Sequence, residues 1–307
     1  MGSQQERIAV IPQTEGLSIW DFVHVGAENA ADRIGASVYW NAPTRQDDVE
    51  AQIALVDRVV SSGYQGLVLA PDQSLALISP VRRALAKGIP TAIIGSPLLL
   101  PPDKNLVSIL NDDEMSGRLA AQRVALLLHN KGTVALLGIN PDIASIMIRT
   151  RAFEQELARI APEVRIVERR EGTYNGPHEQ MVAEDVLRAH PDVDVIVAMM
   201  WMTADGSLRA LDSLGGDHGT KVVTFDSDGP PPFDHWPRLD AVIQEDTRSM
   251  GQKAVEAIDA KLHGRAVPPV TKLAPILITR DNANSAAVHK IMSLDWQIGN
   301  WRWDPIQ

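Results

Sequence analysis

Residues 188–211 read RAHPDVDVIVAMMWMTADGSLRAL, and this stretch joins a strand pattern directly to a helical one. Asp194–Ala198 (DVIVA) is continuously apolar after its first residue, which is typical of a strand covered on both faces in a parallel sheet. From Thr203 to Leu214, apolar residues return at helical spacing. A strand–helix unit of this kind predicts an α/β fold.

The same unit recurs along the chain in two blocks. Gly35, Gly63 and Gly88 stand where helices of the first block should end, as C-cap glycines do. The predicted first block has strands at Arg7–Ile11, Ser37–Trp40, Gly66–Ala70 and Thr91–Gly95, with helices near Asp21–Ile34, Gln46–Ser62 and Ser79–Ala86. The predicted second block has strands at Thr133–Gly138, Val164–Glu168, Asp194–Ala198 and Lys221–Asp226, with helices near Ile146–Ile160, His178–Ala189 and Thr203–Leu214.

Two blocks predict two Rossmann-like, doubly wound lobes with parallel sheets. A single barrel of eight strand–helix units is the competing interpretation. Three further elements favour two lobes, because a barrel would not need them and a chain that crosses back between lobes would. They are a strand at Leu239–Gln244, a helix at Arg248–His263 and an apolar stretch at Ala274–Thr279.

Composition excludes several classes of protein. The chain has 307 residues, 45% of them hydrophobic, and a formal net charge of −10 at pH 7, which repels a phosphate backbone and argues against nucleic-acid binding. It has no cysteine, so disulfides and thiolate metal sites are absent. No apolar run approaches the roughly 18 residues of a membrane span. There is no nucleophile elbow or phosphate-binding loop, so we expect no catalysis, no cofactor and no metal.

Several segments together resemble periplasmic binding proteins of the ribose- and galactose-binding type, a fold shared with the effector domains of lactose-repressor-like regulators. The resemblance covers about Arg7 to Thr279. It rests on six segments that follow one another in the family's order. In this chain they are residues 8–38 (IAVIPQTEGLSIWDFVHVGAENAADRIGASV), 52–73 (QIALVDRVVSSGYQGLVLAPDQ), 86–96 (AKGIPTAIIGS), 149–153 (RTRAF), 188–211 (quoted above) and 221–228 (KVVTFDSD).

The resemblance implies two lobes joined by three crossing segments, with a ligand cleft between them that closes on the ligand. Crossings are expected near Asn111–Asp113, Glu245–Thr247 and Leu273–Pro275. The N-terminal lobe would then be residues 7–110 plus 247–273, the C-terminal lobe 114–244 plus 275–295, and residues 296–307 a tryptophan-rich tail.

Three residues are the principal ligand-binding candidates that the resemblance implies. Trp20 could stack on a sugar ring, although a core tryptophan is the alternative. Arg149, in RTRAF, offers a rigid fork of donors, and Arg151 would face another direction on the same helix. Asp226 could accept two hydroxyl hydrogen bonds, although a turn or capping role competes.

Further ligand positions show where this sequence departs from the family. Tyr174 would supply a wall of the site. Met200 and Trp201 stand where ribose-type proteins usually have Asn-Asp, Gly95-Ser96 stands where Asp-Arg is usual, and Glu245 replaces a common Gln. The departures predict a more apolar site, for a deoxy or modified sugar or another solute. Asn111 could contact ligand or belong to a helix cap with Asp112.

The leading hypothesis is a monomeric solute-binding protein that captures a sugar-like molecule and delivers it to a membrane permease. The alternative is the effector-binding domain of a transcriptional regulator without its DNA-binding headpiece. The opening Met1-Gly2-Ser3 resembles a cloning junction, so we expect a native N-terminal segment to be missing. A removed signal peptide would make the protein periplasmic or secreted.

Overall fold

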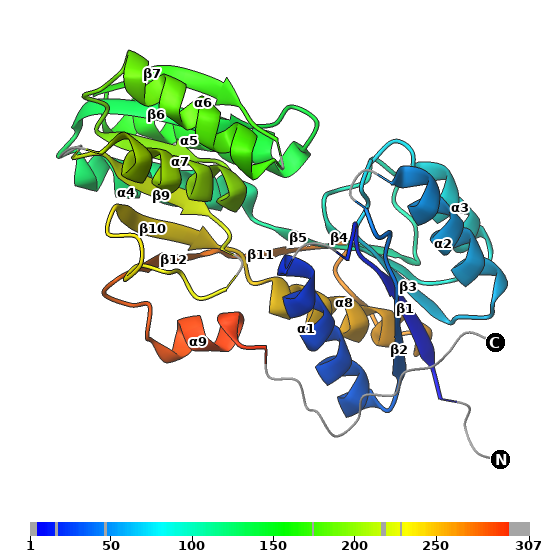
Figure 1. Ribbon diagram of the computed structural model, residues 1–307. Helices are drawn as coiled ribbons and strands as arrows, with labels where there is room; N and C mark the ends of the chain where they lie inside the picture. The colour runs from blue at the N-terminus through cyan, green and yellow to red at the C-terminus, as the bar shows by residue number, and fades with distance from the viewer. Residues whose placement is uncertain are drawn as a thin grey trace. The chain divides into compact units, whose positions relative to one another are not determined.

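A computed structural model describes residues 5–15, 18–45, 48–173, 175–215, 219–227 and 229–294 (Figure 1). The predicted tail at 296–307 lies outside these residues.

Contacts between Cα atoms divide the chain into two compact units. Unit 1 comprises Met1–Asn111, Asp246–Leu273 and Lys290–Gln307, and unit 2 comprises Asp112–Glu245 and Ala274–His289. Of the described residues, 290–294 therefore belong to unit 1, whereas the predicted second lobe extends to residue 295.

Unit 1 contains a six-stranded sheet with the strand order β11-β5-β4-β3-β1-β2, and every neighbouring pair is parallel. Two of its strands, β5 and β11, have no counterpart among the predicted elements. The described elements of this unit are β1 (Arg7–Ile11), α1 (Ile19–Ile34), β2 (Ser37–Trp40), α2 (Val49–Ser61), β3 (Gly66–Leu69), α3 (Ile78–Ala86), β4 (Thr91–Gly95), β5 (Leu106–Asn111), α8 (Thr247–Leu262) and β11 (Val270–Leu273).

Unit 2 repeats this plan with the strand order β12-β10-β9-β8-β6-β7, in which only β12 pairs antiparallel with its neighbour. Two separate sheets exclude the single barrel. The described elements of unit 2 are α4 (Asp113–Leu127), β6 (Lys131–Ile139), α5 (Ala144–Ile160), β7 (Glu163–Glu171), α6 (Gly176–Ala189), β8 (Val195–Ala198), α7 (Trp201–Leu214), β9 (Lys221–Phe225), β10 (Leu239–Gln244) and β12 (Ile276–Thr279); α9 (Ala286–Met292) spans the division.

Each sheet is covered on both faces, which explains its continuously apolar strands. In unit 1, alternate strand residues such as Val10 and Ile94 pack against α1 and α8, while Ile11 and Ile93 pack against α2 and α3. Figure 1 shows α1 and α8 side by side in this unit. In unit 2, α4 and α5 pack together over one face of the sheet, around Phe153.

The predicted helix ends are largely confirmed. Gly35 is the left-handed C-cap of α1, and Gly63 and Gly88 also have positive φ. The start of α3 was predicted one residue too late: the helix begins at Ile78 and not at Ser79. Among the described helices, none is long and apolar enough to cross a membrane.

Glycines let paired helices approach until their backbones touch. A Cβ atom on Gly26 of α1 would lie 1.9 Å from the carbonyl oxygen of Arg248, and one on Gly251 of α8 would lie 2.0 Å from that of Val23. In unit 2, a Cβ on Gly117 of α4 would lie 2.2 Å from the carbonyl oxygen of Arg149 on α5. These distances leave no room for a side chain, so the glycines fix how close the helices stand.

We expect Gly251→Ala to destabilise the protein by about 1–3 kcal/mol, because the added methyl group forces α1 and α8 apart. Gly219→Ala is the matched control, since no atom lies within 4 Å of its added Cβ. Urea unfolding followed by circular dichroism measures both changes. Equal stability of Gly251→Ala and the wild type would show that this helix contact is not tight.

Glu156 of α5 makes stability depend on pH. Hydrogen bonds from Arg159 and Gln122 lower the pKa of Glu156 from 4.5 to about 2. A carboxyl whose pKa is lowered on folding stabilises the folded state above its unfolded pKa, and this contribution is lost as the pH falls toward the folded value. We therefore expect Glu156→Gln to lower the free energy of unfolding at pH 7 and to approach the wild type between about pH 4.5 and 2. Urea titrations across this range check the trend, and a difference that stays constant with pH would contradict it.

Candidate functional site

The candidate site in unit 2 lies where parallel strands end. β8, β9 and β10 run in the same direction, so their carboxyl ends meet at one edge of the sheet, where open α/β sheets bind ligands. Asp226 directly follows β9, and Glu245 directly follows β10. The backbone of Asp226 has a φ of 49°, a left-handed conformation that is uncommon for aspartate. Its N–H donates to the carbonyl oxygen of Ile243 at 3.1 Å, which holds the two strand ends together.

Arg149 brings these strand ends together with α5. Its Nη1 lies 3.1 Å from Oδ2 of Asp226 and 3.6 Å from Oε1 of Glu245. The backbone N–H of Glu245 donates to the other carboxylate oxygen of Asp226 at 3.0 Å. The guanidinium lies over the ring of Phe225, 4.7 Å from its centroid, a favourable cation–π geometry. The structure therefore brings together three of the predicted site residues in one connected cluster.

This cluster is buried. The side chains of Arg149, Asp226 and Glu245 are 7%, 17% and 8% exposed. Burial by itself lowers the pKa of Arg149, but the carboxylates of Asp226, Glu245 and Asp113 together raise it above its ordinary value. Burial raises the pKa of Asp226, and the Arg149 guanidinium and the Glu245 N–H oppose that rise. The arginine is therefore a permanent cation among several carboxylates.

One donor of this cluster is available. Arg149 Nε is buried, and it has no hydrogen-bond partner among the residues that the structure describes. A buried donor without a partner is costly, so such atoms in native proteins call for an explanation. A ligand oxygen at this position would supply the missing acceptor. Arg151, the alternative arginine, is exposed on the same helix.

Trp20 occupies the start of α1 in unit 1 and is 7% exposed. It belongs to the apolar cluster that α1 and α8 form with the sheet. A Cβ on Gly95, at the carboxyl end of β4, would lie 3.6 Å from Cη2 of Trp20. Trp20 Nε1 also has no hydrogen-bond partner within the described part of the chain. Trp20 therefore combines a packing role with a free donor near a strand end.

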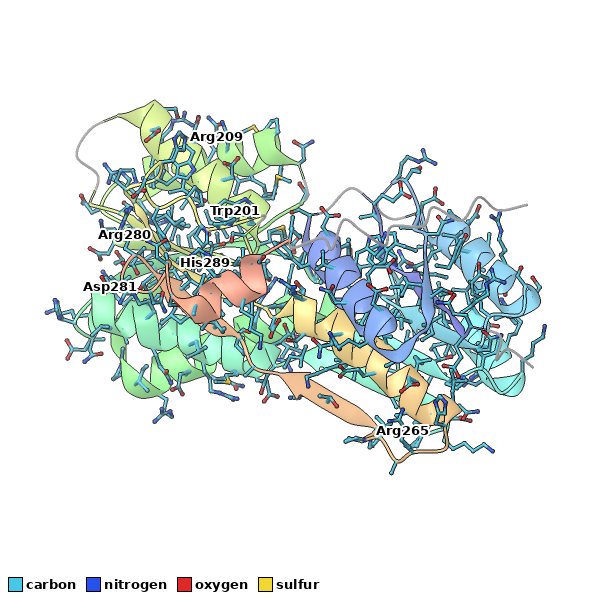
Figure 2. The ribbon with its side chains drawn as sticks, turned by 90° about the horizontal axis from the view of Figure 1, so that it is seen from below. Trp201, Arg209, Arg265, Arg280, Asp281 and His289 are labelled. Atoms are coloured by element: carbon cyan, nitrogen blue, oxygen red, sulfur yellow. The ribbon has the colours of Figure 1, made fainter. Side chains whose placement is uncertain are left out.

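The remaining predicted residues have different surroundings. Met200 is 6% exposed. Its side chain packs in the apolar cluster between the sheet and the helices α4 and α5, so most of its surface is buried in the core of unit 2. Trp201 begins α7 and is partly exposed (Figure 2). Asn111 ends β5 in unit 1 and is 8% exposed. Tyr174 lies outside the described residues.

Two neighbours of Arg149 were not predicted. Asp113 is buried at the start of α4, close enough to raise the pKa of the arginine, and Phe225 supplies the ring beneath it. An acidic residue in the first turn of a helix has an ordinary explanation in the helix dipole, so the sequence carried no signal for a role of Asp113 at the site. Phe225 is one apolar strand residue among many.

Among the described residues, one group has the spacing of metal ligands: Glu6, Asp259 and His263, whose ligand atoms lie within 4.8 Å of one another. Asp259 forms ion pairs with Arg265 and with His263, the latter at 3.1 Å. These ion pairs account for the cluster as a network of charges within unit 1, whereas Arg149, Asp226 and Glu245 belong to unit 2.

Comparisons with known proteins show which sequences this chain is similar to. Residues 8–228 match the family model of the periplasmic binding protein domain. The ribose import binding protein RbsB of Bacillus subtilis (strain 168) is 27% identical over 244 residues, 79% of this chain and 77% of that protein. The D-allose-binding periplasmic protein of Escherichia coli (strain K12) is 24% identical over 272 residues, 85% of this chain and 86% of that protein.

A solved structure shares the fold. The solute-binding protein of an ABC transporter from Agrobacterium vitis, bound with alpha-D-tagatopyranose, superimposes with a TM-score of 0.84 at 22% identity, over 94% of this chain and 99% of that chain. At this identity the likeness supports the fold and not the ligand. The family model, however, covers more than half of the sequence. The chain therefore belongs to the periplasmic binding protein family.

Proposed function

We propose that this protein is the sugar-binding component of an ABC importer, and that it binds its ligand without converting it. The observation that carries this proposal is the buried Arg149–Asp226–Glu245 cluster, with its free Nε donor, at the carboxyl ends of β9 and β10. The curated relatives include proteins named for ribose import and D-allose binding, which favours transport over the effector domain of a regulator. The proposed location is the periplasm or the exterior of the cell.

The cluster has the chemistry that a polyhydroxylated ligand needs. A carboxylate accepts hydrogen bonds from sugar hydroxyls, and a guanidinium donates to the ring or hydroxyl oxygens. Asp226 is already held by Arg149 and by the Glu245 N–H, so its orientation is set before a ligand arrives. Such preorganisation lowers the entropic cost of binding. Apolar faces of the sugar would lie on aromatic rings, for which Trp20 and Trp201 are the candidates.

We infer that the preferred sugar presents fewer hydroxyls than ribose. Positions 200 and 201 carry the apolar side chains of Met200 and Trp201. Gly95 has no side chain that could form a hydrogen bond with a sugar hydroxyl. Met200 is largely buried in the core, so Trp201 is the residue of this pair with surface to offer. A deoxy or otherwise modified sugar fits these departures better than ribose does.

A thermal-shift screen tests the proposal. It should include D-ribose, D-allose, D-arabinose, xylitol and their deoxy analogues, together with amino acids as a different class of solute. A true ligand at about 100 times its Kd should add about 2.7 kcal/mol of apparent stability. We expect at least one sugar or polyol to do so, with a deoxy sugar ahead of its parent. Stabilisation by amino acids alone would overturn the sugar assignment.

We expect Arg149→Ala to weaken sugar binding by at least about tenfold, or about 1.4 kcal/mol, because it removes a donor and the positive charge that pairs with the carboxylates of Asp226 and Glu245. Arg149→Lys keeps the positive charge but loses the planar guanidinium and its paired donors, so the loss of affinity should be intermediate. The matched control is Arg151→Ala, on the exposed side of the same helix.

Calorimetric titration of each variant with the sugar found by screening gives the Kd, and circular dichroism checks the fold. Binding of Arg149→Lys and Arg149→Ala at wild-type strength, in folded protein, would show that the cluster is structural and that the sugar binds elsewhere.

A further inference from the structure

The two units carry a buried polar side chain at the same place in their topology. In each unit, the sheet's edge strand is followed by a helix with a side-chain N-cap: Asp48 before α2 and Asn175 before α6. The residue four positions after each cap is Gln52 in unit 1 and Glu179 in unit 2. They are 0% and 1% exposed. A buried amide and a buried carboxylate are costly unless fully hydrogen-bonded, so their partners indicate what they do.

Gln52 connects two neighbouring strands at their carboxyl ends. Its Nε2 donates to the carbonyl oxygens of Pro12 and Ala70, at 3.0 and 2.8 Å, which are the residues directly after β1 and β3. Its Oε1 accepts from the N–H of Asp72 at 3.0 Å. The amide therefore fixes the backbone that leaves both strands.

Glu179 joins a different pair of segments in unit 2, and it does so only as a hydrogen-bond acceptor. Its Oε1 accepts from the N–H of Thr173 at 2.6 Å and from the hydroxyl of the same residue at 3.2 Å, just after β7. Its Oε2 accepts from the hydroxyl of Thr203 at 2.5 Å, in the first turn of α7. The carboxylate therefore joins the loop after β7 to the helix that begins with Trp201.

Glycines make room for this second connection. A Cβ on Gly172 would lie 2.8 Å from Oε2 of Glu179, and a Cβ on Gly138 would lie 2.4 Å from Oγ1 of Thr203. Gly138 also has a φ of 78°, which favours glycine. The backbones at the carboxyl ends of β6 and β7 thus close directly around the Glu179–Thr203 hydrogen bond.

We propose that Gln52 and Glu179, at equivalent positions in the topology of their units, are positioning residues that hold strand-end loops in the geometry that binds the sugar, without touching the sugar. This inference rests on the proposed function and names residues that support it. Their hydrogen bonds reach only the backbone or the hydroxyls of these loops and of the first turn of α7. Preorganised contacts of this kind decide affinity because the loop need not be ordered on binding.

Thr203 offers the sharpest test, because Thr203→Val removes the hydroxyl that donates to Glu179 while keeping the side chain's shape. Thr203→Ser keeps the hydroxyl and serves as the conservative rescue. Glu184→Gln is the control on the same helix as Glu179: its carboxylate pairs with Arg188 and Gln180 on α6 and with Ser213 on α7, away from the strand ends. Gln52→Met, which keeps length but loses the amide, tests unit 1.

Two readouts are needed: calorimetric titration with D-ribose and the sugars of the screen, and hydrogen exchange of the segments around Thr173 and Trp201. We expect Thr203→Val and Gln52→Met to weaken binding by about tenfold. Exchange around Thr173 should rise in Thr203→Val, while Thr203→Ser and Glu184→Gln keep wild-type binding and wild-type exchange there.

The outcomes separate this inference from the proposed function. If the wild-type protein binds a sugar and Thr203→Val binds it equally well, Glu179 has only a structural role. The inference then fails, while the proposed function stands. If exchange around Thr173 is unchanged in Thr203→Val, the connection does not order the loop, and the inference also fails. If the wild-type protein binds no sugar, the proposed function fails, and the inference fails with it even where exchange rises.

Discussion

A guanidinium leaves water only where carboxylates and hydrogen bonds replace its hydration, and the candidate site depends on this exchange at Arg149. Its partners come from three places in the chain: Asp113 at the start of α4, Asp226 after β9 and Glu245 after β10. Breaking such a buried pair is more costly than the pair itself is worth, because a charge remains without a partner. The cluster therefore contributes little to stability by itself, and it is suited to binding a ligand that brings its own hydrogen-bonding groups.

The fold delivers these groups through close backbone packing. Gly117 lets α4 touch α5 at the carbonyl oxygen of Arg149, which sets the position of the arginine relative to the sheet. The positive φ of Asp226 then turns its carboxylate back toward the arginine and the Glu245 N–H. Elements that look like ordinary α/β architecture thus determine where each polar atom of the cluster lies.

The sequence predicted the repeated strand–helix units because apolar runs and C-cap glycines are local signals. It did not reveal β5 or β11, since LVSILN alternates buried and part-buried residues and VTKL is half polar at the edge of its sheet. Arg149 and Asp226 were found by resemblance, and Arg149 was preferred over Arg151 by its position in RTRAF. Asp113, Gln52 and Glu179 were missed because burial of a polar side chain is a property of the folded chain. Near helix starts, such residues look like caps or solvent-facing positions.

The order of the chain through its two sheets has a consequence for how the protein is made. Unit 1 is completed by β11, in which Val270 lies beside Ser108 of β5, so this sheet cannot be finished until most of the chain has been synthesised. Each unit has five of its six strands in one uninterrupted segment, and in unit 2 only α8 and β11 separate β10 from its last partner, β12. Contacts between residues distant in sequence form slowly, because a long loop must close first. The edge of β5 therefore stays exposed while the first segment of unit 2 is synthesised, whereas β10 gains its last partner after one helix and one strand.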